Sequence, residues 1–298
     1  MELAFIEYLR NKPETTLLGD DAAVVGQTLY TVDMLTEGVD FLLDQVTPEK
    51  IGRKALAVNL SDIAAMGGVP TDYLVSVALP QNNHSLDLAK RLYAGMLPLA
   101  EKYGVRIIGG DTNSWNGGLV ISVTVIGAVS KYGVIRRGGG KPNDRLLVTG
   151  PLGGSLLDHQ FSFEPRIFEA EYLLKHFSIS AGLDISDGLS LDLARLTRES
   201  HLGATLIAEQ IPIAEDARTL ANQTGMTPLT HALSDGEDFE LLLAVPSEVA
   251  QKLVVEQPLR PLCGVTLYDI GFLTDTPGLR ILENGQKSVL VPKGFVHE

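Results

Sequence analysis

Cysteine is almost absent from this sequence: Cys263 is the only one in 298 residues. A single cysteine excludes a disulfide within the chain and fits a protein of a reducing compartment. No apolar run approaches the roughly 20 residues that a membrane-spanning helix needs. The first residues, with acids at Glu2 and Glu7, do not resemble a signal peptide. We therefore expect a cytoplasmic protein without a membrane partner.

Positive charge is also scarce. The chain has 24 lysine and arginine residues against 37 aspartate and glutamate residues, which gives a formal net charge of -13. Nucleic acids and anionic membranes are bound by basic surfaces, so this composition argues against both kinds of partner. It does not exclude a small polyanionic ligand whose charge is balanced by metal ions. With 45% hydrophobic residues, the chain can bury the core of one large or two moderate domains.

Familiar motifs for phosphate and metal binding are missing. The sequence contains no GxxxxGK[ST] motif and no GxGxxG motif after a predicted strand. Its six histidines form no HExxH or similar pattern. Gly153-Gly154-Ser155, at the start of a predicted helix, is a weak candidate for an anion cradle of backbone N–H groups. Arg136 and Arg137, beside three glycines, are better candidates for a phosphate contact, although a solvated linker would have the same composition.

The pattern of apolar residues predicts alternating helices and strands. The predicted helices include residues 2–10, 47–66 and 84–103, and the predicted strands include residues 73–79, 105–108, 119–129, 145–149 and 239–245. This order is typical of an α/β or α+β fold. Glycines and charges interrupt the pattern at residues 136–144. We therefore predict two domains, residues 1–137 and residues 138–298.

The predicted helix at residues 47–66 is apolar on almost every face, and a helix of that kind is usually buried. Near its end, within Asn59–Gly68, stands one carboxylate, Asp62. A buried carboxylate must be paired, hydrogen-bonded or bound to a metal, because an isolated buried charge is very costly. The partner of Asp62 is the main question that the sequence poses.

Asp62 belongs to a set of acids that lie in or at the end of apolar elements, mostly beside glycine or serine: Asp21, Asp33, Asp62, Asp111, Asp184, Asp187 and Glu237. Small neighbours allow a ligand to approach closely. If these acids converge, their oxygen atoms suit Mg²⁺ or Mn²⁺ rather than zinc. The alternative is that they cap helices and turns, for which aspartate is also favoured, and Ser186-Asp187-Gly188 fits such a cap. Spacing alone does not decide between the two.

Five segments together resemble a known family. In chain order they are Gly19–Ala23, Lys54–Gly67, Gly109–Thr112, Asp184–Leu189 and Gly236–Leu241. By these motifs the chain closely resembles the thiamine-monophosphate kinases, which share a superfamily with aminoimidazole ribonucleotide synthetase and selenophosphate synthetase. The resemblance extends from about Gly19 to Phe295, and the motifs around Asp62 and Asp184 are long and specific.

The resemblance implies a two-domain α/β fold like that of aminoimidazole ribonucleotide synthetase, in which the N-terminal sheets of a homodimer join into a barrel. It also implies that ATP and several Mg²⁺ ions lie between the two domains. The implied metal ligands are Asp21, Thr31, Asp33, Asp62, Asp111, Asp184 and Asp187. The implied nucleotide contacts are Tyr93, Gly110, Asp111, Arg137 and Ser186, and the implied acceptor contacts are Asp40, Glu237 and Phe295.

The implied reaction transfers the γ-phosphoryl group of ATP to thiamine monophosphate and yields thiamine diphosphate and ADP. The acceptor phosphate is already an anionic nucleophile near neutral pH. Charge neutralisation and in-line positioning therefore matter more than a strong base. We accordingly predict no catalytic general base.

The chain departs from the family pattern at three places. The family usually has Ser-Thr-Asp where this chain has Thr31-Val32-Asp33, so Val32 can offer a metal only its backbone. Asp40 replaces a histidine that would face the acceptor phosphate, and an acid there repels the phosphate unless a metal intervenes. The segment between residues 155 and 184 is shorter than the family leads us to expect.

These departures keep two alternatives open. One is an ATP-dependent enzyme of the same superfamily with a different small-molecule acceptor. The other is a nucleotide-binding dimer without turnover. Selenophosphate synthesis is disfavoured, because the cysteine or selenocysteine usual near the N-terminus is absent and the single cysteine is Cys263.

Overall fold

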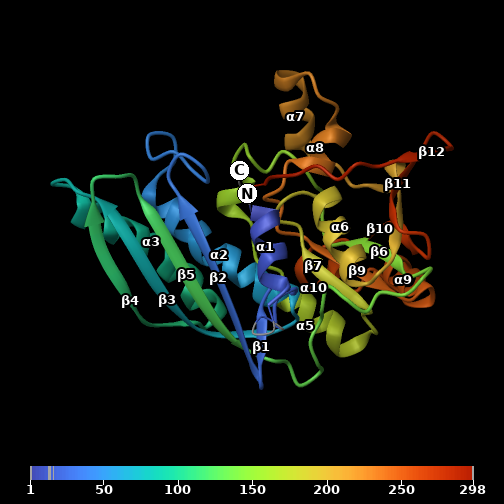
Figure 1. Cartoon of the computed structure of the whole chain (residues 1–298), viewed down its shortest axis with the longest axis horizontal. Helices are drawn as coiled ribbons and strands as arrows, with labels where there is room; N and C mark the ends of the chain where they lie inside the picture. Colours follow the sequence, from blue (N-terminus) through green and yellow to red (C-terminus); the bar gives the residue numbers. More distant parts are fainter. Residues whose placement is uncertain (1, 13–14, 16, 297–298) are drawn as a thin grey trace.

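Figure 1 shows the computed structural model of the chain, which describes residues 2–12, 15 and 17–296. Two β-sheets lie on the left and right of this view, with helices around and between them. This mixed architecture confirms the predicted α/β fold class. No helix in the described part of the chain is long and apolar enough to span a membrane. The predicted boundary at residue 137 falls in the connection between the sheets, and the division into domains remains a prediction.

The N-terminal sheet has five strands in the order β1-β2-β5-β3-β4. They are β1 (Ala23–Val25), β2 (Thr28–Thr36), β3 (Val69–Pro80), β4 (Arg106–Trp115) and β5 (Val120–Ala128). Strands β3 and β4 pair in parallel, and the other neighbours pair antiparallel. Helix α1 (Glu2–Arg10) precedes the sheet and lies between the two sheets in the view of Figure 1.

Helix α2 (Pro48–Ala65) lies against this sheet and is buried over most of its circumference. It starts at the N-cap Thr47 with Pro48 in its first turn, and Gly67, with a φ of 64°, follows its end. It contacts β2 and β5 of the sheet, α3 (Ser85–Tyr103), and, in the C-terminal half, α5 (Ile167–His176) and β7 (Ala181–Asp184). The predicted burial of this helix is therefore confirmed.

Helices α2 and α3 touch backbone to backbone at two glycines. A Cβ atom on Gly52 would lie 1.9 Å from the carbonyl oxygen of Leu92, and one on Gly95 would lie 1.8 Å from the carbonyl oxygen of Glu49. A larger residue at either position would push the helices apart. This close packing fixes the position of α2 against α3, and with it the position of the charged side chains of α2.

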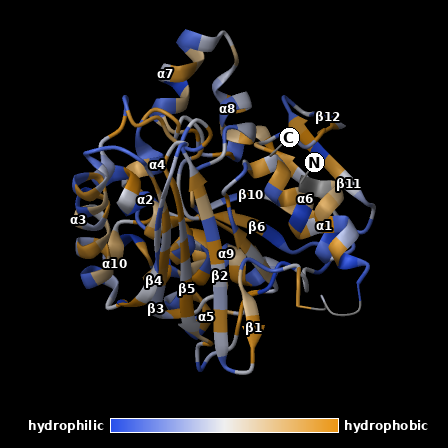
Figure 2. Cartoon of the chain, turned by 60° about the vertical axis from the view of Figure 1, so that its left-hand side comes forward, coloured by the Kyte–Doolittle hydropathy of each residue, from blue (hydrophilic) through white to orange (hydrophobic). Residues whose placement is uncertain are grey.

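The opposite face of the N-terminal sheet is open and carries apolar side chains. Along β2, residues alternate between the two faces: Thr31 is buried toward α2, whereas Tyr30, Val32 and Met34 are exposed. Strand β4 is exposed along its whole length. Figure 2 turns these strands toward the viewer and shows apolar residues along β1 and β2.

The C-terminal sheet has seven strands in the order β12-β11-β8-β10-β6-β9-β7. Its strands are β6 (Arg145–Val148), β7 (Ala181–Asp184), β8 (Gly203–Ile207), β9 (Leu241–Val245), β10 (Tyr268–Thr274), β11 (Gly278–Glu283) and β12 (Gln286–Val289). The helices of this half are α4 (His159–Ser162), α5 (Ile167–His176), α6 (Leu189–Glu199), η2 (Ala208–Gln210), α7 (Glu215–Thr224), α8 (Pro228–Ser234), α9 (Ser247–Glu256) and α10 (Arg260–Cys263). Strand β9 is buried throughout, as its continuous apolar sequence predicts.

A strap from the C-terminal half, residues 155–166, ties the two halves together. Arg53 of α2 donates hydrogen bonds to the carbonyl groups of Phe161 and Phe163 at 3.3 and 2.6 Å. Lys102 of α3 forms an ion pair of 2.6 Å with Glu164. The strap is the first part of residues 155–184, the segment that is shorter than the family pattern leads us to expect. Its hydrogen bonds with Arg53 position it over α2.

Two local predictions are wrong. Strand β4 does not end before Gly109 but continues to Trp115, because Gly109 and Gly110 keep an extended backbone and stay paired with β3. No helix starts at Ser155, since α4 begins only at His159 and spans one turn.

Candidate active site

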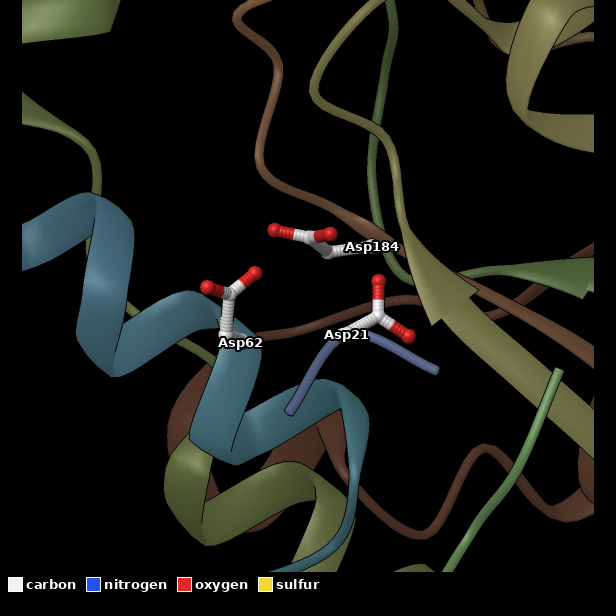
Figure 3. Close-up of side chains that lie close together, drawn as sticks. All are labelled: Asp21, Asp62 and Asp184. Atoms are coloured by element: carbon white, nitrogen blue, oxygen red, sulfur yellow. The ribbon is translucent and has the colours of Figure 1, made fainter. Parts of the chain in front are cut away.

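Three of the predicted acids meet where the two halves of the molecule join. Asp21 precedes β1, Asp62 lies near the end of α2 and Asp184 ends β7. One carboxylate oxygen from each lies within 4.8 Å of those of the other two. Figure 3 shows the three side chains pointing toward a common space. The cluster thus joins residues from both halves of the molecule, which their spacing in the sequence could not establish.

These carboxyl groups repel one another. Burial and then the neighbouring charges of Asp33, Asp184 and Asp21 raise the pKa of Asp62 well above its usual value, although a hydrogen bond from the Thr31 hydroxyl acts against this. Burial, followed by Asp21, likewise raises the pKa of Asp184. Burial also raises the pKa of Asp33 to about 6. Acids this close resist ionising together unless a cation lies between them.

Polar residues of α2 orient the acids around them. Ser61 donates a hydrogen bond to the carboxylate of Asp184 at 2.5 Å. Asn59 accepts a hydrogen bond from the backbone N–H of Asp33 at 3.0 Å. The Asn59–Asp62 stretch therefore supplies one acid and holds two others, Asp33 within β2 and Asp184 at the end of β7.

Two arginines balance part of the negative charge. Arg137 pairs with Asp21, with 2.7 Å between its Nη2 and Asp21 Oδ1. Arg195 of α6 pairs with Asp187 and, at 2.7 Å, with Asp192. Sequence reasoning singled out Arg137 but missed Arg195, because an arginine in an amphipathic helix carries no signal of a site.

The alternative interpretation of Asp187 as a helix cap is wrong. The N-cap of α6 is Gly188, which has no side chain to make a cap hydrogen bond. Asp192 accepts hydrogen bonds from the backbone N–H groups of Asp187 and Gly188 at 3.0 and 3.1 Å. Burial raises the pKa of Asp192 to about 7. The carboxylate of Asp187 pairs with Arg195 and lines the cavity beside the acid cluster.

Most of the predicted site residues line one cavity of about 500 Å³. They are Asp21, Thr31, Asp33, Asp40, Asp62, Arg137, Asp184, Ser186, Asp187, Glu237 and Phe295. Three others do not line it: Tyr93 packs against the N-terminal core, and Gly110 and Asp111 lie on the exposed edge strand β4. Within one chain, the eleven lining residues therefore come together, whereas Tyr93, Gly110 and Asp111 lie apart from them.

A second cavity, of about 610 Å³, adjoins the first. The two share Asp40, Glu237 and Phe295, the residues predicted to contact the acceptor. Apolar side chains form much of the remaining wall of the second cavity: Phe41, Leu42, Val46, Leu156, Leu157 and Phe161. The acidic first cavity and the more apolar second cavity thus meet at the three predicted acceptor residues.

Sequence reasoning also missed Lys54, which is fully buried in α2. Its ammonium nitrogen lies 2.7 Å from Glu237 Oε2. The signal was present, because a lysine in an otherwise apolar helix needs a partner for the same reason as Asp62 does.

Residues 19–129 match the family model described as "AIR synthase related protein, N-terminal domain". The chain is 39% identical to the thiamine-monophosphate kinase of Rhodopirellula baltica, over 100% of this chain and 97% of that relative. It is 36% identical to the thiamine-monophosphate kinase of Bacillus subtilis, over 94% of this chain and 92% of that relative. The chain belongs to the thiamine-monophosphate kinase family.

A solved structure described as "AaThiL complexed with AMPPCP and TMP" is also similar, with a TM-score of 0.84 and 27% identity. The match covers 98% of this chain and 96% of that chain. The similarity therefore includes both halves of the molecule and the junction at which the acids meet.

Two departures from the family pattern have a definite place in the structure. Asp40 lines both cavities, and its Oδ2 accepts a hydrogen bond of 2.7 Å from the backbone N–H of Thr36, which closes its own turn. The Val32 side chain is 62% exposed on the outer face of β2. It therefore points away from Thr31 and Asp33, and the face that they share with Asp62 is unaffected.

The weak candidate for an anion cradle in the sequence is wrong. The backbone N–H of Gly153 donates to Asp238 at 2.9 Å, and that of Gly154 donates to Asp235 at 3.0 Å. These N–H groups are occupied by carboxylates of the chain itself, so the turn offers no phosphate site.

Proposed function

We propose that this protein transfers the γ-phosphoryl group of ATP to thiamine monophosphate and releases thiamine diphosphate and ADP. The observation that carries the proposal is the convergence of acids from both halves of the chain beside a second, more apolar cavity. Membership of the thiamine-monophosphate kinase family supports it, as does the similar structure described in complex with AMPPCP and TMP.

Magnesium ions fit the acid cluster by the chemistry of its ligands. Asp21, Asp62 and Asp184 offer carboxylate oxygens close together, and Thr31 adds a hydroxyl. Such oxygen ligands suit a hard divalent cation. Burial, followed by the charge of neighbouring acids, raises the pKa of Asp62 and of Asp184. We propose that these residues, with Asp33 and Asp187, hold Mg²⁺. Bound there, Mg²⁺ would neutralise phosphate charge and favour in-line transfer.

The residues of the chain contribute orientation and charge. Arg137 and Arg195 bring guanidinium groups to the acidic cavity, where they can bind phosphate oxygens of ATP. Ser186 lies on the same wall. Because the acceptor phosphate is itself the nucleophile, we assign no residue as a general base.

The second cavity fits the organic part of the acceptor. Its aromatic and aliphatic wall suits a heteroaromatic ring system, and Phe295 lies at the junction with the acidic cavity. Glu237 adds negative charge beside it, which suits the cationic ring of thiamine. We propose that the acceptor occupies this cavity with its phosphate group toward Asp62.

We further propose that the protein acts as a homodimer in the cytoplasm. The exposed apolar face of the N-terminal sheet supports a dimer, since side chains such as Val32, Met34 and Ile108 would be buried in it. Gly110 and Asp111 lie on β4 of that sheet, away from the cavity of their own chain. A second copy joined through this sheet could bring them to its partner's nucleotide. Residues 1–137 would then form the metal-binding and dimerisation domain.

A coupled assay of ADP release tests the proposed function. We expect turnover that requires ATP, Mg²⁺ and thiamine monophosphate together, with thiamine diphosphate formed in equal amount to ADP. ADP release with another phosphorylated acceptor alone would favour a different enzyme of the superfamily. Binding of ATP without turnover of any acceptor tested would favour a nucleotide-binding dimer.

A further inference from the structure

Lys54 is a charged residue in the middle of α2, and none of its surface is exposed. Its Nζ lies 2.7 Å from Glu237 Oε2 and donates hydrogen bonds to the Gln160 side chain at 2.7 Å and to the Asp40 carbonyl at 3.3 Å. The ring of Phe161 lies beneath it, with its centroid 5.2 Å away. One ammonium group thus joins four segments from both halves of the molecule.

The acidic partner, Glu237, stands on the wall that the two cavities share. Its backbone is in the left-handed region, with a φ of 59°, and its N–H donates to the carbonyl of Ser186 at 2.7 Å. Its Oε2 is buried against Lys54, while the side chain keeps 24% of its surface exposed. Lys54 therefore holds the carboxylate on its buried side, and the exposed side of the Glu237 side chain faces the two cavities.

The charges around Glu237 make Lys54 necessary for this arrangement. Burial raises the pKa of Glu237, and the nearby acids Asp40 and Asp187 act in the same direction. The charge of Lys54 is the main effect that opposes them. Without Lys54, Glu237 would be one more carboxyl group among like charges and would bind its proton more readily.

Stability alone does not account for a lysine at this place. Buried ion pairs are often no more stabilising than apolar side chains of the same volume, and the four positions that follow Lys54 in α2, residues 55–58, are apolar and buried. The two halves are also joined by pairs that lie outside both cavities, such as Lys102 with Glu164 at 2.6 Å. Unlike Glu164, the partner of Lys54 lines both cavities.

We propose that Lys54 is a positioning residue for acceptor binding, which acts by holding the carboxylate of Glu237 in place toward the second cavity. The inference rests on the proposed function, because it takes that cavity as the site of thiamine monophosphate. Lys54 itself is behind Glu237 and does not touch the acceptor.

A double-mutant cycle on the full-length protein tests the inference. The variants are Lys54→Met, Glu237→Gln and the double variant, with Lys102→Met as a matched control whose ion pair lies outside both cavities. The dissociation constant of thiamine monophosphate is measured by titration calorimetry with Mg²⁺, and KM and kcat are measured in the coupled assay. Binding of a non-hydrolysable ATP analogue is measured in parallel.

We expect Lys54→Met to raise the dissociation constant and KM for thiamine monophosphate by about 30-fold or more, as is typical when one partner of a buried charge pair is truncated. The double variant should bind the acceptor no more weakly than Glu237→Gln does, since Lys54 acts only through Glu237. ATP-analogue binding should be retained in each variant, and Lys102→Met should bind the acceptor like the wild type.

Two results would overturn the inference while leaving the proposed function intact: unchanged acceptor binding in Lys54→Met, or losses that simply add in the double variant. If Lys54→Met fails to fold, the comparison of the double variant with Glu237→Gln still decides, because the double variant leaves no unpaired charge. A wild type that neither binds nor phosphorylates thiamine monophosphate would overturn both the inference and the proposed function.

Discussion

Lys54 and Asp62 are charged residues of the same buried helix, α2, and they differ in how their charges are balanced. Their spacing of two helical turns places both toward the cavities between the two halves. Lys54 is surrounded by groups that balance its charge: a carboxylate, an amide oxygen and a carbonyl. Asp62 accepts a hydrogen bond from the Thr31 hydroxyl and otherwise lies beside the acids Asp21, Asp33 and Asp184.

The difference separates two uses of a buried charge. A charge that is balanced within the chain fixes the arrangement of that chain, whether or not a ligand is present. A carboxylate that faces other carboxylates remains costly until a cation from outside joins them. The charge at the Lys54 end of α2 is thus balanced by the chain itself, whereas we propose that a bound cation balances the charge at the Asp62 end.

The largest expected effect comes from removing the unbalanced charge. Asp62→Asn keeps the size of the side chain, and we expect Mg²⁺-dependent ADP release to fall by about a thousandfold. The metal-free variant should unfold at no lower temperature than the wild type, because one of several like charges is gone. Enzyme assays and thermal unfolding without divalent ions check both parts.

Asp269→Asn is the matched control for this change. Asp269 pairs with Arg145 on the C-terminal sheet, away from both cavities. The control should keep full turnover. Normal Mg²⁺-dependent turnover in Asp62→Asn would instead mark Asp62 as a purely structural acid and remove the contrast with Lys54.

Magnesium should stabilise the wild type through the Asp62 end of α2. At a concentration of about 100 times its dissociation constant, Mg²⁺ is expected to add about 2.7 kcal/mol to the free energy of unfolding, which is roughly 5 °C in Tm. The same addition should have little effect on Asp62→Asn, and sodium chloride of equal ionic strength should have little effect on either protein. An equal Mg²⁺ effect in both proteins would place the ion elsewhere.

Asp238 shows a third way to accommodate a buried acid, by keeping its proton. Burial raises its pKa to about 8, against hydrogen bonds from Ser155 and from the Gly153 N–H. The native state therefore holds a proton that the unfolded chain releases above pH 3.8, so the stability that depends on it declines as pH rises from about 4 to about 8.

Asp238→Asn should remove this dependence on pH. Relative to the wild type, the variant should gain up to about 1.4 kcal/mol in free energy of unfolding for each pH unit in that range. Denaturant unfolding at several pH values measures the gap. Parallel stability curves for the two proteins would show that Asp238 is ionised in the folded state.

The smallest expected effect concerns Asp40, beside the Lys54 end of α2. Asp40→His restores the residue usual in the family and removes a negative charge from the acceptor site. We expect KM for thiamine monophosphate to fall roughly fivefold, equivalent to about 1 kcal/mol. Steady-state kinetics at fixed ATP check it, and an unchanged KM would place Asp40 outside the acceptor site.

The sequence predicted those parts of the site in which a local pattern of residues reflects burial or small neighbouring side chains. The continuous apolar pattern of α2 predicted its burial, and the burial made Asp62 conspicuous. Small residues beside Asp21 and Asp184 marked them as candidates, and the family motifs ordered them into one site. The roles of these residues, and of Asp111 on the edge strand β4, remain predictions.

Other features depend on contacts between residues far apart in the chain. Of the partners of Lys54, Gln160 comes from the one-turn helix α4 and Glu237 from a loop, and no periodicity fixes the position of either. Arg195 looks like any solvated residue of an amphipathic helix until α6 is docked beside Asp187. Strand β4 continues through Gly109 because pairing with β3 outweighs the tendency of glycine to end a strand.

The central claim is that Asp62 meets a divalent cation rather than a partner within the chain. Its most direct test is a crystal structure of the protein grown with Mn²⁺ and a non-hydrolysable ATP analogue, with anomalous diffraction recorded to locate the metal. We predict an anomalous peak between the carboxylates of Asp21, Asp62 and Asp184, next to the phosphate groups. A bound analogue with no metal at these carboxylates would contradict the claim.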